Sequence, residues 1–124
     1  MARLLIVEDD DSVRELAARA LERAGYSVET ACDGEEGLAR IVAAEGRYDL
    51  VVSDIRMPAM DGIEMSRQAA ARYPGLRIML VTGFADQRER AKELDGIIVD
   101  VLLKPFSLAS IRDTVAKNLA LAPA

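Results

Sequence analysis

Leu50-Val51-Val52-Ser53-Asp54-Ile55-Arg56-Met57-Pro58 is the stretch that decides the fold. Its apolar start has the length and composition of a strand buried on both faces. The strand ends in a carboxylate, Asp54, and a loop with a proline follows at once. In open α/β sheets the groups that carry chemistry lie just beyond the carboxyl ends of the strands. Asp54 is therefore the first candidate for a functional residue.

The rest of the chain alternates strand-like and helix-like segments around this stretch. Strands are predicted over 3–7, 26–31, 48–53, 77–81 and 97–103. A helix is predicted after each strand: the first three end by Gly25, Gly46 and Tyr73, the fourth covers 84–94, and the last ends at about Leu119. Alternation of this kind predicts an α/β fold with a doubly wound parallel sheet, covered on both faces and joined by right-handed crossovers. The expected strand order is 2-1-3-4-5.

Polar residues at the start of each segment predict where the helices begin. Asp11 or Ser12 is expected to cap the first helix, and Asp33, Asp61 and Ser107 are expected to cap later ones. Helical spacing predicts one inward-facing stripe on the first helix: Val13, Leu16, Ala17, Ala20, Leu21 and Ala24. The 26–31 segment alternates, which favours an edge strand.

The composition limits the function classes open to the chain. Its 124 residues fit one domain, so we expect a single domain over 1–124 and no output domain. A formal net charge of −5 disfavours direct binding to nucleic acid. No apolar run nears the ~20 residues of a membrane span, and no signal peptide is visible, so we expect a cytoplasmic protein. Histidine is absent, which removes His-based catalysis and His metal ligands. The single Cys32 is expected to be a small residue near the core.

Polar side chains follow four of the predicted strands. Glu8 and Asp9 follow the first strand, Asp54 the third, Thr82 the fourth and Lys104 the fifth. Alone, each has an ordinary explanation as a helix cap, a loop acid, a turn residue or a solvated charge. Together they predict one site, because the first and third strands flank the topological switch point of this sheet. Three close carboxylates need a cation, and Mg²⁺ is the expected one.

Several motifs give the chain a resemblance to a known family, the receiver domains of two-component response regulators. They are Ile6-Val7-Glu8-Asp9-Asp10, Ser53-Asp54-Ile55-Arg56-Met57-Pro58 with Met60-Asp61-Gly62, Val81-Thr82-Gly83 and Lys104-Pro105-Phe106. The resemblance covers essentially the whole chain and implies the flavodoxin-like, CheY-like (βα)5 receiver fold. The run from Thr82 to Ala91 is similar to that of a stand-alone receiver subgroup.

The resemblance implies a role for each candidate residue. Asp54 would be the phosphoacceptor, and Glu8, Asp9 and Asp54 would hold Mg²⁺ together with the backbone carbonyl of Arg56. Thr82 and Lys104 would contact phosphoryl oxygens. The Lys104-Pro105 bond would be cis, which costs far less before proline than elsewhere. Aspartyl phosphate formation needs positioning and charge neutralisation rather than a general base.

One position departs from the family pattern. Receivers commonly have Tyr or Phe three residues before the lysine, and this chain has Val101 there. Valine has no ring to rotate inward, so either Val101 merely packs or another residue moves in its place. Phe84, two residues after Thr82, is the hypothetical substitute.

The resemblance also implies partners. A histidine kinase or histidine phosphotransfer protein would donate the phosphoryl group, and the stand-alone subgroup binds ClpX, the unfoldase of the ClpXP protease. Gln87-Arg88-Glu89-Arg90 is either a solvated helix face or part of that partner surface. A motor-type or phosphate-shuttling receiver with another protein target is the alternative.

Two further functions are disfavoured by particular residues. Aspartate-nucleophile phosphohydrolases carry a second Asp two residues after the nucleophile, where this chain has Arg56, so we expect no enzyme acting on other molecules. A flavin-binding module is disfavoured because acids follow the first strand, where a flavin phosphate would be repelled. Only self-phosphorylation and slow hydrolysis of the product remain as expected chemistry.

Overall fold

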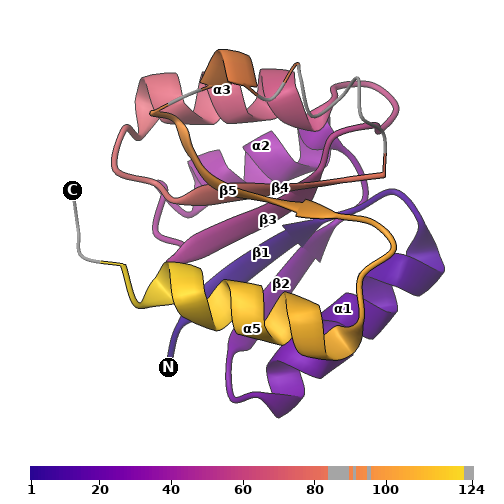
Figure 1. Cartoon of the computed structure of the whole chain (residues 1–124). Helices are drawn as coiled ribbons and strands as arrows, with labels where there is room; N and C mark the ends of the chain where they lie inside the picture. Colours follow the sequence, from indigo (N-terminus) through magenta and orange to yellow (C-terminus); the bar gives the residue numbers. More distant parts are fainter. Residues whose placement is uncertain (84–89, 91, 95, 122–124) are drawn as a thin grey trace.

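The fold is a five-stranded parallel sheet in the order β2-β1-β3-β4-β5, as predicted (Figure 1). A computed structural model describes residues 1–83, 90, 92–94 and 96–121. The strands are β1 Arg3–Val7, β2 Ser27–Ala31, β3 Leu50–Asp54, β4 Ile78–Thr82 and β5 Ile98–Leu103. All neighbouring strands pair in parallel, and β2 lies at an edge, as its alternating sequence predicts.

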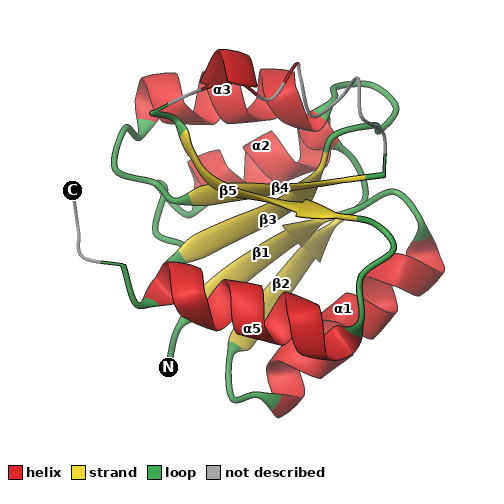
Figure 2. Cartoon of the chain, in the orientation of Figure 1, coloured by secondary structure: helices red, strands yellow, loops and turns green. Residues whose placement is uncertain are grey.

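Helices cover both faces of the sheet (Figure 2). Those within the described residues are α1 Asp11–Arg23, α2 Gly34–Ala43, α3 Gly62–Arg72 and α5 Leu108–Leu119, with a 3-10 turn, η1, at Lys92–Leu94. The helices α1 and α5 pack together on one face, and α2 and α3 pack together on the other. None of these helices is long and apolar enough to cross a membrane.

Each face of the sheet has its own hydrophobic core, which explains why β1 is a continuous apolar run. Leu5 and Val7 belong to the cluster under α2 and α3, whereas Leu4 and Ile6 belong to the cluster under α1 and α5. Successive strand residues point to opposite faces, so both sets are buried. Each fully buried Leu or Ile contributes about 1.5–3 kcal/mol to stability.

Side-chain caps begin the four helices at or next to the predicted residues. Asp33, Asp61 and Ser107 are the N-caps of α2, α3 and α5, as predicted. In α1 the N-cap is Asp10, next to Asp11 and Ser12: its backbone is extended at φ −79° and ψ 115°, and its side chain accepts the N–H of Val13. Asp11 lies inside the first turn, where its charge suits the positive end of the helix dipole.

Three residues expected inside lie outside: Leu16, Cys32 and Ala24, which is the C-cap of α1. Leu16 is 55% exposed, because the buried stripe of α1 runs along Ala17, Ala20 and Leu21 instead. Cys32 is also exposed, since it follows the last residue of the edge strand β2, and its thiol donates a hydrogen bond of 2.8 Å to Glu36. The exposure of Leu16 follows from the rotation of α1 about its axis, which hydrophobic spacing defines only coarsely.

The fourth predicted helix falls largely outside the described residues. Phe84 and the run Gln87-Arg88-Glu89 lie outside them, so the interpretations of these residues remain predictions, while Arg90 is described and exposed. Val101 is partly buried and packs against the core cluster under α2 and α3. This packing agrees with the interpretation in which Val101 only fills space.

Strand register brings the predicted polar residues to one edge of the sheet. Val7 pairs with Ser53, so Glu8 and Asp54 are the next residues of neighbouring strands. Asp54 in turn pairs with Val81, and Thr82 pairs with Leu103. The residues that follow β1, β3, β4 and β5 therefore meet at the carboxyl edge, where the site is built.

Candidate functional site

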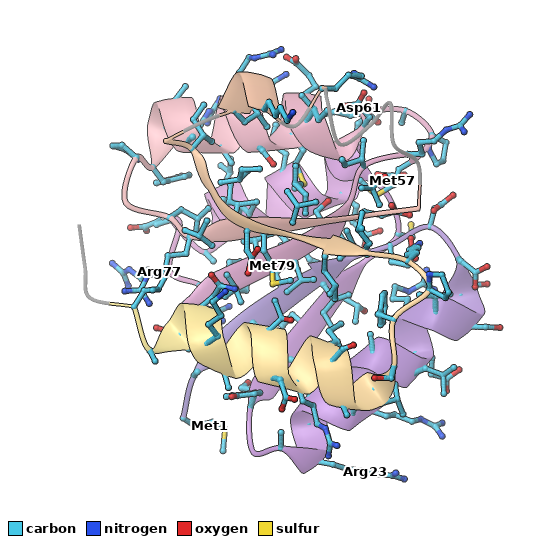
Figure 3. The ribbon with its side chains drawn as sticks, viewed as in Figure 1. Met1, Arg23, Met57, Asp61, Arg77 and Met79 are labelled. Carbon is cyan, nitrogen blue, oxygen red and sulfur yellow. The ribbon has the colours of Figure 1, made fainter. Side chains whose placement is uncertain are left out.

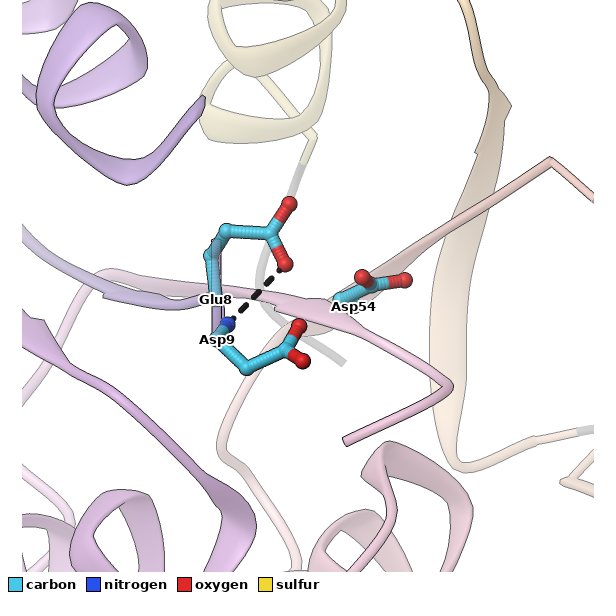
Figure 4. Close-up of side chains that lie close together, drawn as sticks. All are labelled: Glu8, Asp9 and Asp54. Carbon is cyan, nitrogen blue, oxygen red and sulfur yellow. Dashed lines mark hydrogen bonds between the residues drawn. The ribbon is translucent and has the colours of Figure 1, made fainter. Parts of the chain in front are cut away.

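Three carboxylates converge at the carboxyl edge of the sheet (Figure 4). Glu8 and Asp9 follow β1 and Asp54 ends β3, and one carboxylate oxygen from each lies within 4.8 Å of those of the other two. We call this cluster the acidic notch. Oxygen ligands of this kind fit a hard divalent cation such as Mg²⁺.

The ammonium of Lys104 closes the acidic notch. Its Nζ donates to Glu8 Oε1 at 2.7 Å and to Asp54 Oδ2 at 3.0 Å. Lys104 follows β5 directly, and its backbone N–H donates to the carbonyl of Thr82 at 2.8 Å. The Lys104-Pro105 peptide bond is cis, as the family resemblance implies. A cation from β5 is thus held against acids from β1 and β3.

Burial makes the notch electrostatically unusual. Glu8 is only 4% exposed, and this burial raises its pKa from 4.5 to about 7, with a further rise from Asp54 and an opposing effect from Lys104. Burial lowers the pKa of Lys104, but its hydrogen bonds to Glu8 and Asp54 raise the pKa by more, so it is raised overall. At neutral pH the lysine is charged, and Glu8 is divided between its neutral and ionised forms.

Backbone groups orient the carboxylates. Asp54 Oδ1 accepts the N–H of Ile55 at 2.8 Å, and Glu8 Oε2 accepts the N–H of Asp9 at 3.1 Å. Gly62 packs against the carbonyl oxygen of Asp54 so closely that an added Cβ would overlap it. The start of α3 therefore supports the backbone of the central acid.

Thr82 and Arg56 occupy different surroundings near the notch. Thr82 is 1% exposed and ends β4, one residue further toward the carboxyl edge than the partner of Asp54. Arg56 is exposed, two residues after Asp54. The structure thus brings Glu8, Asp9, Asp54 and Lys104 together. It places Thr82 beside them at the end of β4, and Arg56 in the loop after β3.

Two surface hollows border the notch, and the sequence predicted neither. One is apolar, has a volume of about 470 Å³, and includes Leu16, Lys104, Phe106 and Leu108 in its lining. The other is charged and contains an ion pair that the sequence did not indicate, in which Arg90 donates to Asp61 at 2.8 Å. These two residues are 29 positions apart in the sequence, which leaves no local pattern that would reveal the pair.

The comparisons with known proteins establish the family. The model of the "Response regulator receiver domain" matches residues 4–116. The chain therefore belongs to the receiver domains of two-component response regulators, as the sequence motifs predicted.

Relatives of different architecture share this domain. The chain is 43% identical over 109 residues to the response regulator MprA of Mycolicibacterium vanbaalenii, which is 88% of this chain but 46% of that protein. It is 38% identical over 119 residues to the receiver protein CpdR of Brucella abortus, 96% of this chain and 98% of that protein. It is 36% identical to the sensor kinase CckA of Brucella abortus over 95% of this chain and 12% of that protein. The chain thus spans about half the length of the MprA regulators that it matches.

Solved structures confirm the fold. Vibrio cholerae CheY4 has a TM-score of 0.84 and 32% identity, covering 95% of this chain and 98% of that one. Thermotoga maritima TrrA, solved in complex with Mg²⁺ and BeF, has a TM-score of 0.85 and 30% identity, covering 95% of this chain and 99% of that one. The CheY-like architecture expected from the sequence is the architecture observed.

Proposed function

We propose that this chain is a response regulator that accepts a phosphoryl group on Asp54 in a Mg²⁺-dependent phosphorelay and then acts through phosphorylation-dependent protein–protein contacts. The observation that carries the proposal is Lys104 Nζ at 3.0 Å from Asp54 Oδ2, within a cluster of three carboxylates. A nucleophile, a candidate metal site and a cation for the transferred group are thereby together in a receiver-family chain.

Each residue of the site would have its own role in phosphoryl transfer. An Asp54 carboxylate oxygen attacks phosphorus, its bond to phosphorus forms, and the bond from phosphorus to the leaving group breaks. Lys104 turns from Asp54 to a phosphoryl oxygen and neutralises its charge, and Thr82 donates a hydrogen bond to another. Glu8, Asp9, Asp54 and the Arg56 carbonyl would hold Mg²⁺, which supplies further neutralisation of the phosphoryl oxygens. Attack by water later resets Asp54.

The partners follow from the architectures of the relatives. CpdR matches over nearly its whole length, and CckA matches through one part of a kinase. We infer that a histidine kinase or phosphotransfer protein in the cytoplasm supplies the phosphoryl group. We propose ClpX of ClpXP as the target, with the chain acting as an adaptor for proteolysis and not as an enzyme on other substrates. A CheY-like or phosphate-shuttling role with another target is the alternative.

Phosphate uptake tests the central claim. Wild type incubated with acetyl phosphate and Mg²⁺ is expected to gain the mass of one phosphoryl group by intact-protein mass spectrometry, and Asp54→Ala is expected to gain none. Asp113→Ala, which removes an exposed aspartate of α5, is the matched control and should behave as wild type. An unmodified wild type, or an equally modified Asp54→Ala, would overturn the proposal.

The target is tested separately. Purified ClpX should be retained by one phosphorylation state of wild type and not by the other, with Asp54→Ala fixed in the unphosphorylated behaviour. Retention independent of phosphorylation, or none at all, would favour the shuttling or motor-type alternative.

A further inference from the structure

Arg14 reaches back from α1 to the loop that carries two of the notch acids. Its side chain is 21% exposed, and its Nη1 donates a hydrogen bond of 2.9 Å to the backbone carbonyl of Glu8, six residues earlier in the sequence. Its Nη2 donates to Asp11 Oδ1 at 2.5 Å. The guanidinium therefore ties the first helix to the backbone of the acidic notch.

The carbonyl that Arg14 holds belongs to the peptide unit between Glu8 and Asp9. The N–H of the same unit, on Asp9, donates to Glu8 Oε2 at 3.1 Å (Figure 4). Because a trans peptide unit is planar, its C=O and its N–H point in opposite directions. Arg14 and the Glu8 carboxylate therefore hold the two ends of one rigid plane, and rotation of this plane would break both hydrogen bonds.

The orientation of this peptide unit decides where both carboxylates point. The backbone before Glu8 is fixed by β2, since the N–H of Glu8 donates to the carbonyl of Ala31 at 3.0 Å. The backbone after Glu8 is held by Arg14. If the plane rotated, the N–H of Asp9 would leave Glu8 Oε2, and the Asp9 carboxylate would move relative to that of Asp54.

The contact of Arg14 with Glu8 distinguishes it from the other arginines of α1. Arg19 pairs with Glu15 at 2.6 Å, and Arg23 ends the helix on the outer surface of the molecule (Figure 3). Such exposed ion pairs contribute little to stability. A guanidinium that donates to a partly buried carbonyl makes a stronger, charge-assisted hydrogen bond. The geometry thus gives Arg14 a role in the site rather than on the surface alone.

We propose that Arg14 is a positioning residue for the candidate Mg²⁺ site: by holding the Glu8–Asp9 peptide unit, it aims the carboxylates of Glu8 and Asp9 at the cation. This inference rests on the proposed Mg²⁺-dependent phosphorylation of Asp54. It assigns to Arg14 the preorganisation of the metal ligands and no contact with the phosphoryl group.

The charge of Arg14 gives the proposal a sign that electrostatics alone does not produce. Removing a positive charge beside a cation site would, by charge alone, strengthen the binding of Mg²⁺. Removing a group that orients the ligands weakens metal binding, typically by about 10- to 100-fold. The direction in which the affinity changes therefore separates positioning from charge.

The experiment measures the Mg²⁺ affinity of the unphosphorylated protein by isothermal titration calorimetry. Arg14→Gln is expected to weaken binding about tenfold. Arg14→Lys should weaken it about threefold, because it keeps the charge but shares one ammonium between Asp11 and the Glu8 carbonyl. Arg19→Gln is the matched control: it removes the same charge from the same helix and should bind Mg²⁺ as wild type does.

Two further measurements test the positioning itself. Without Mg²⁺, hydrogen exchange of the Asp9 amide should be faster in Arg14→Gln than in wild type, whereas that of the Ile55 amide, which donates to Asp54 Oδ1, should not change. With acetyl phosphate as donor, the Mg²⁺ concentration for half-maximal phosphorylation should rise about tenfold in Arg14→Gln. The rate at saturating Mg²⁺ should stay within about twofold of wild type.

Unchanged or tighter Mg²⁺ binding by Arg14→Gln would overturn the inference, as would an equal loss in Arg19→Gln. A much lower rate at saturating Mg²⁺ would also overturn it, because Arg14 would then act on the transfer itself. Should Arg14→Gln fail to fold, Arg14→Lys decides, and wild-type affinity in that variant would contradict the inference. No Mg²⁺ binding by wild type would instead overturn the metal site of the proposed function.

Discussion

Glu8→Gln should remove a pH dependence of stability that the burial of Glu8 creates. The folded protein holds a proton on Glu8 up to about pH 7, whereas the unfolded chain releases it near 4.5. The folded state is thus favoured at low pH, and this contribution is lost as the pH rises through that window. The interval between the two pKa values corresponds to about 3 kcal/mol.

The assay is urea denaturation of wild type and Glu8→Gln in chelator, from about pH 5 to about pH 8. Glutamine stays neutral, so the free energy of unfolding of wild type should fall by about 2 to 3 kcal/mol relative to that of Glu8→Gln over this range. Groups common to both proteins cancel in the difference. Lys104 does not contribute to this pH dependence of the unfolding free energy, because its raised pKa affects stability only above its ordinary value of 10.5.

A control and a metal titration sharpen the test. Glu15→Gln removes an exposed glutamate that pairs with Arg19 at 2.6 Å, and it should change stability by less than about 1 kcal/mol at either pH. Saturating Mg²⁺ should reduce the loss in wild type, because a metal bound by carboxylates favours their ionised form. Parallel curves for wild type and Glu8→Gln in chelator would refute the argument that burial sets the protonation of Glu8.

Two further outcomes follow from the same site. Gly62→Ala should destabilise the fold by about 3 kcal/mol or more in thermal denaturation, because its Cβ would overlap the backbone oxygen of Asp54. The control is Gly75→Ala, whose Cβ meets nothing within 4 Å and which should cost less than about 1 kcal/mol. Equal losses of stability in the two variants would contradict this account. Asp9→Asn should weaken Mg²⁺ binding at least about tenfold by isothermal titration calorimetry, because it replaces one of three carboxylates at the candidate metal site, whereas undiminished affinity would remove Asp9 from the ligand set.

Sequence reasoning could place the site because parallel strands deliver their carboxyl ends to one edge. Glu8, Asp54 and Lys104 each follow an apolar run, and once the strand order is inferred, their proximity needs no further information. Periodicity alone cannot tell that one lysine bonds two of the acids at once. That contact depends on the orientation of the Lys104 side chain, which the strand pattern does not determine.

The errors arose where several residues satisfy the same local rule. Asp10, Asp11 and Ser12 are all good N-caps, and only the extended backbone of Asp10 decides among them. Leu16 fits the helical stripe as well as Ala17 does, yet the orientation of α1 against the sheet exposes it. The Arg90–Asp61 pair was missed for another reason, since it joins surface charges far apart in sequence.

The charges of the notch indicate how this fold would hold a phosphoryl group and also release it. If all three carboxylates are ionised, they and Lys104 sum formally to −2, so one divalent cation brings the notch to zero. Phosphorylation would replace the single charge of Asp54 with about −2, leaving −1 with the cation and −3 without it. The buried position of Glu8 makes the uncompensated states costly, because repulsion is strongest where water is excluded. On the proposed function, the aspartyl phosphate would therefore be held by the cation and Lys104 jointly, and the same residual repulsion would favour its hydrolysis.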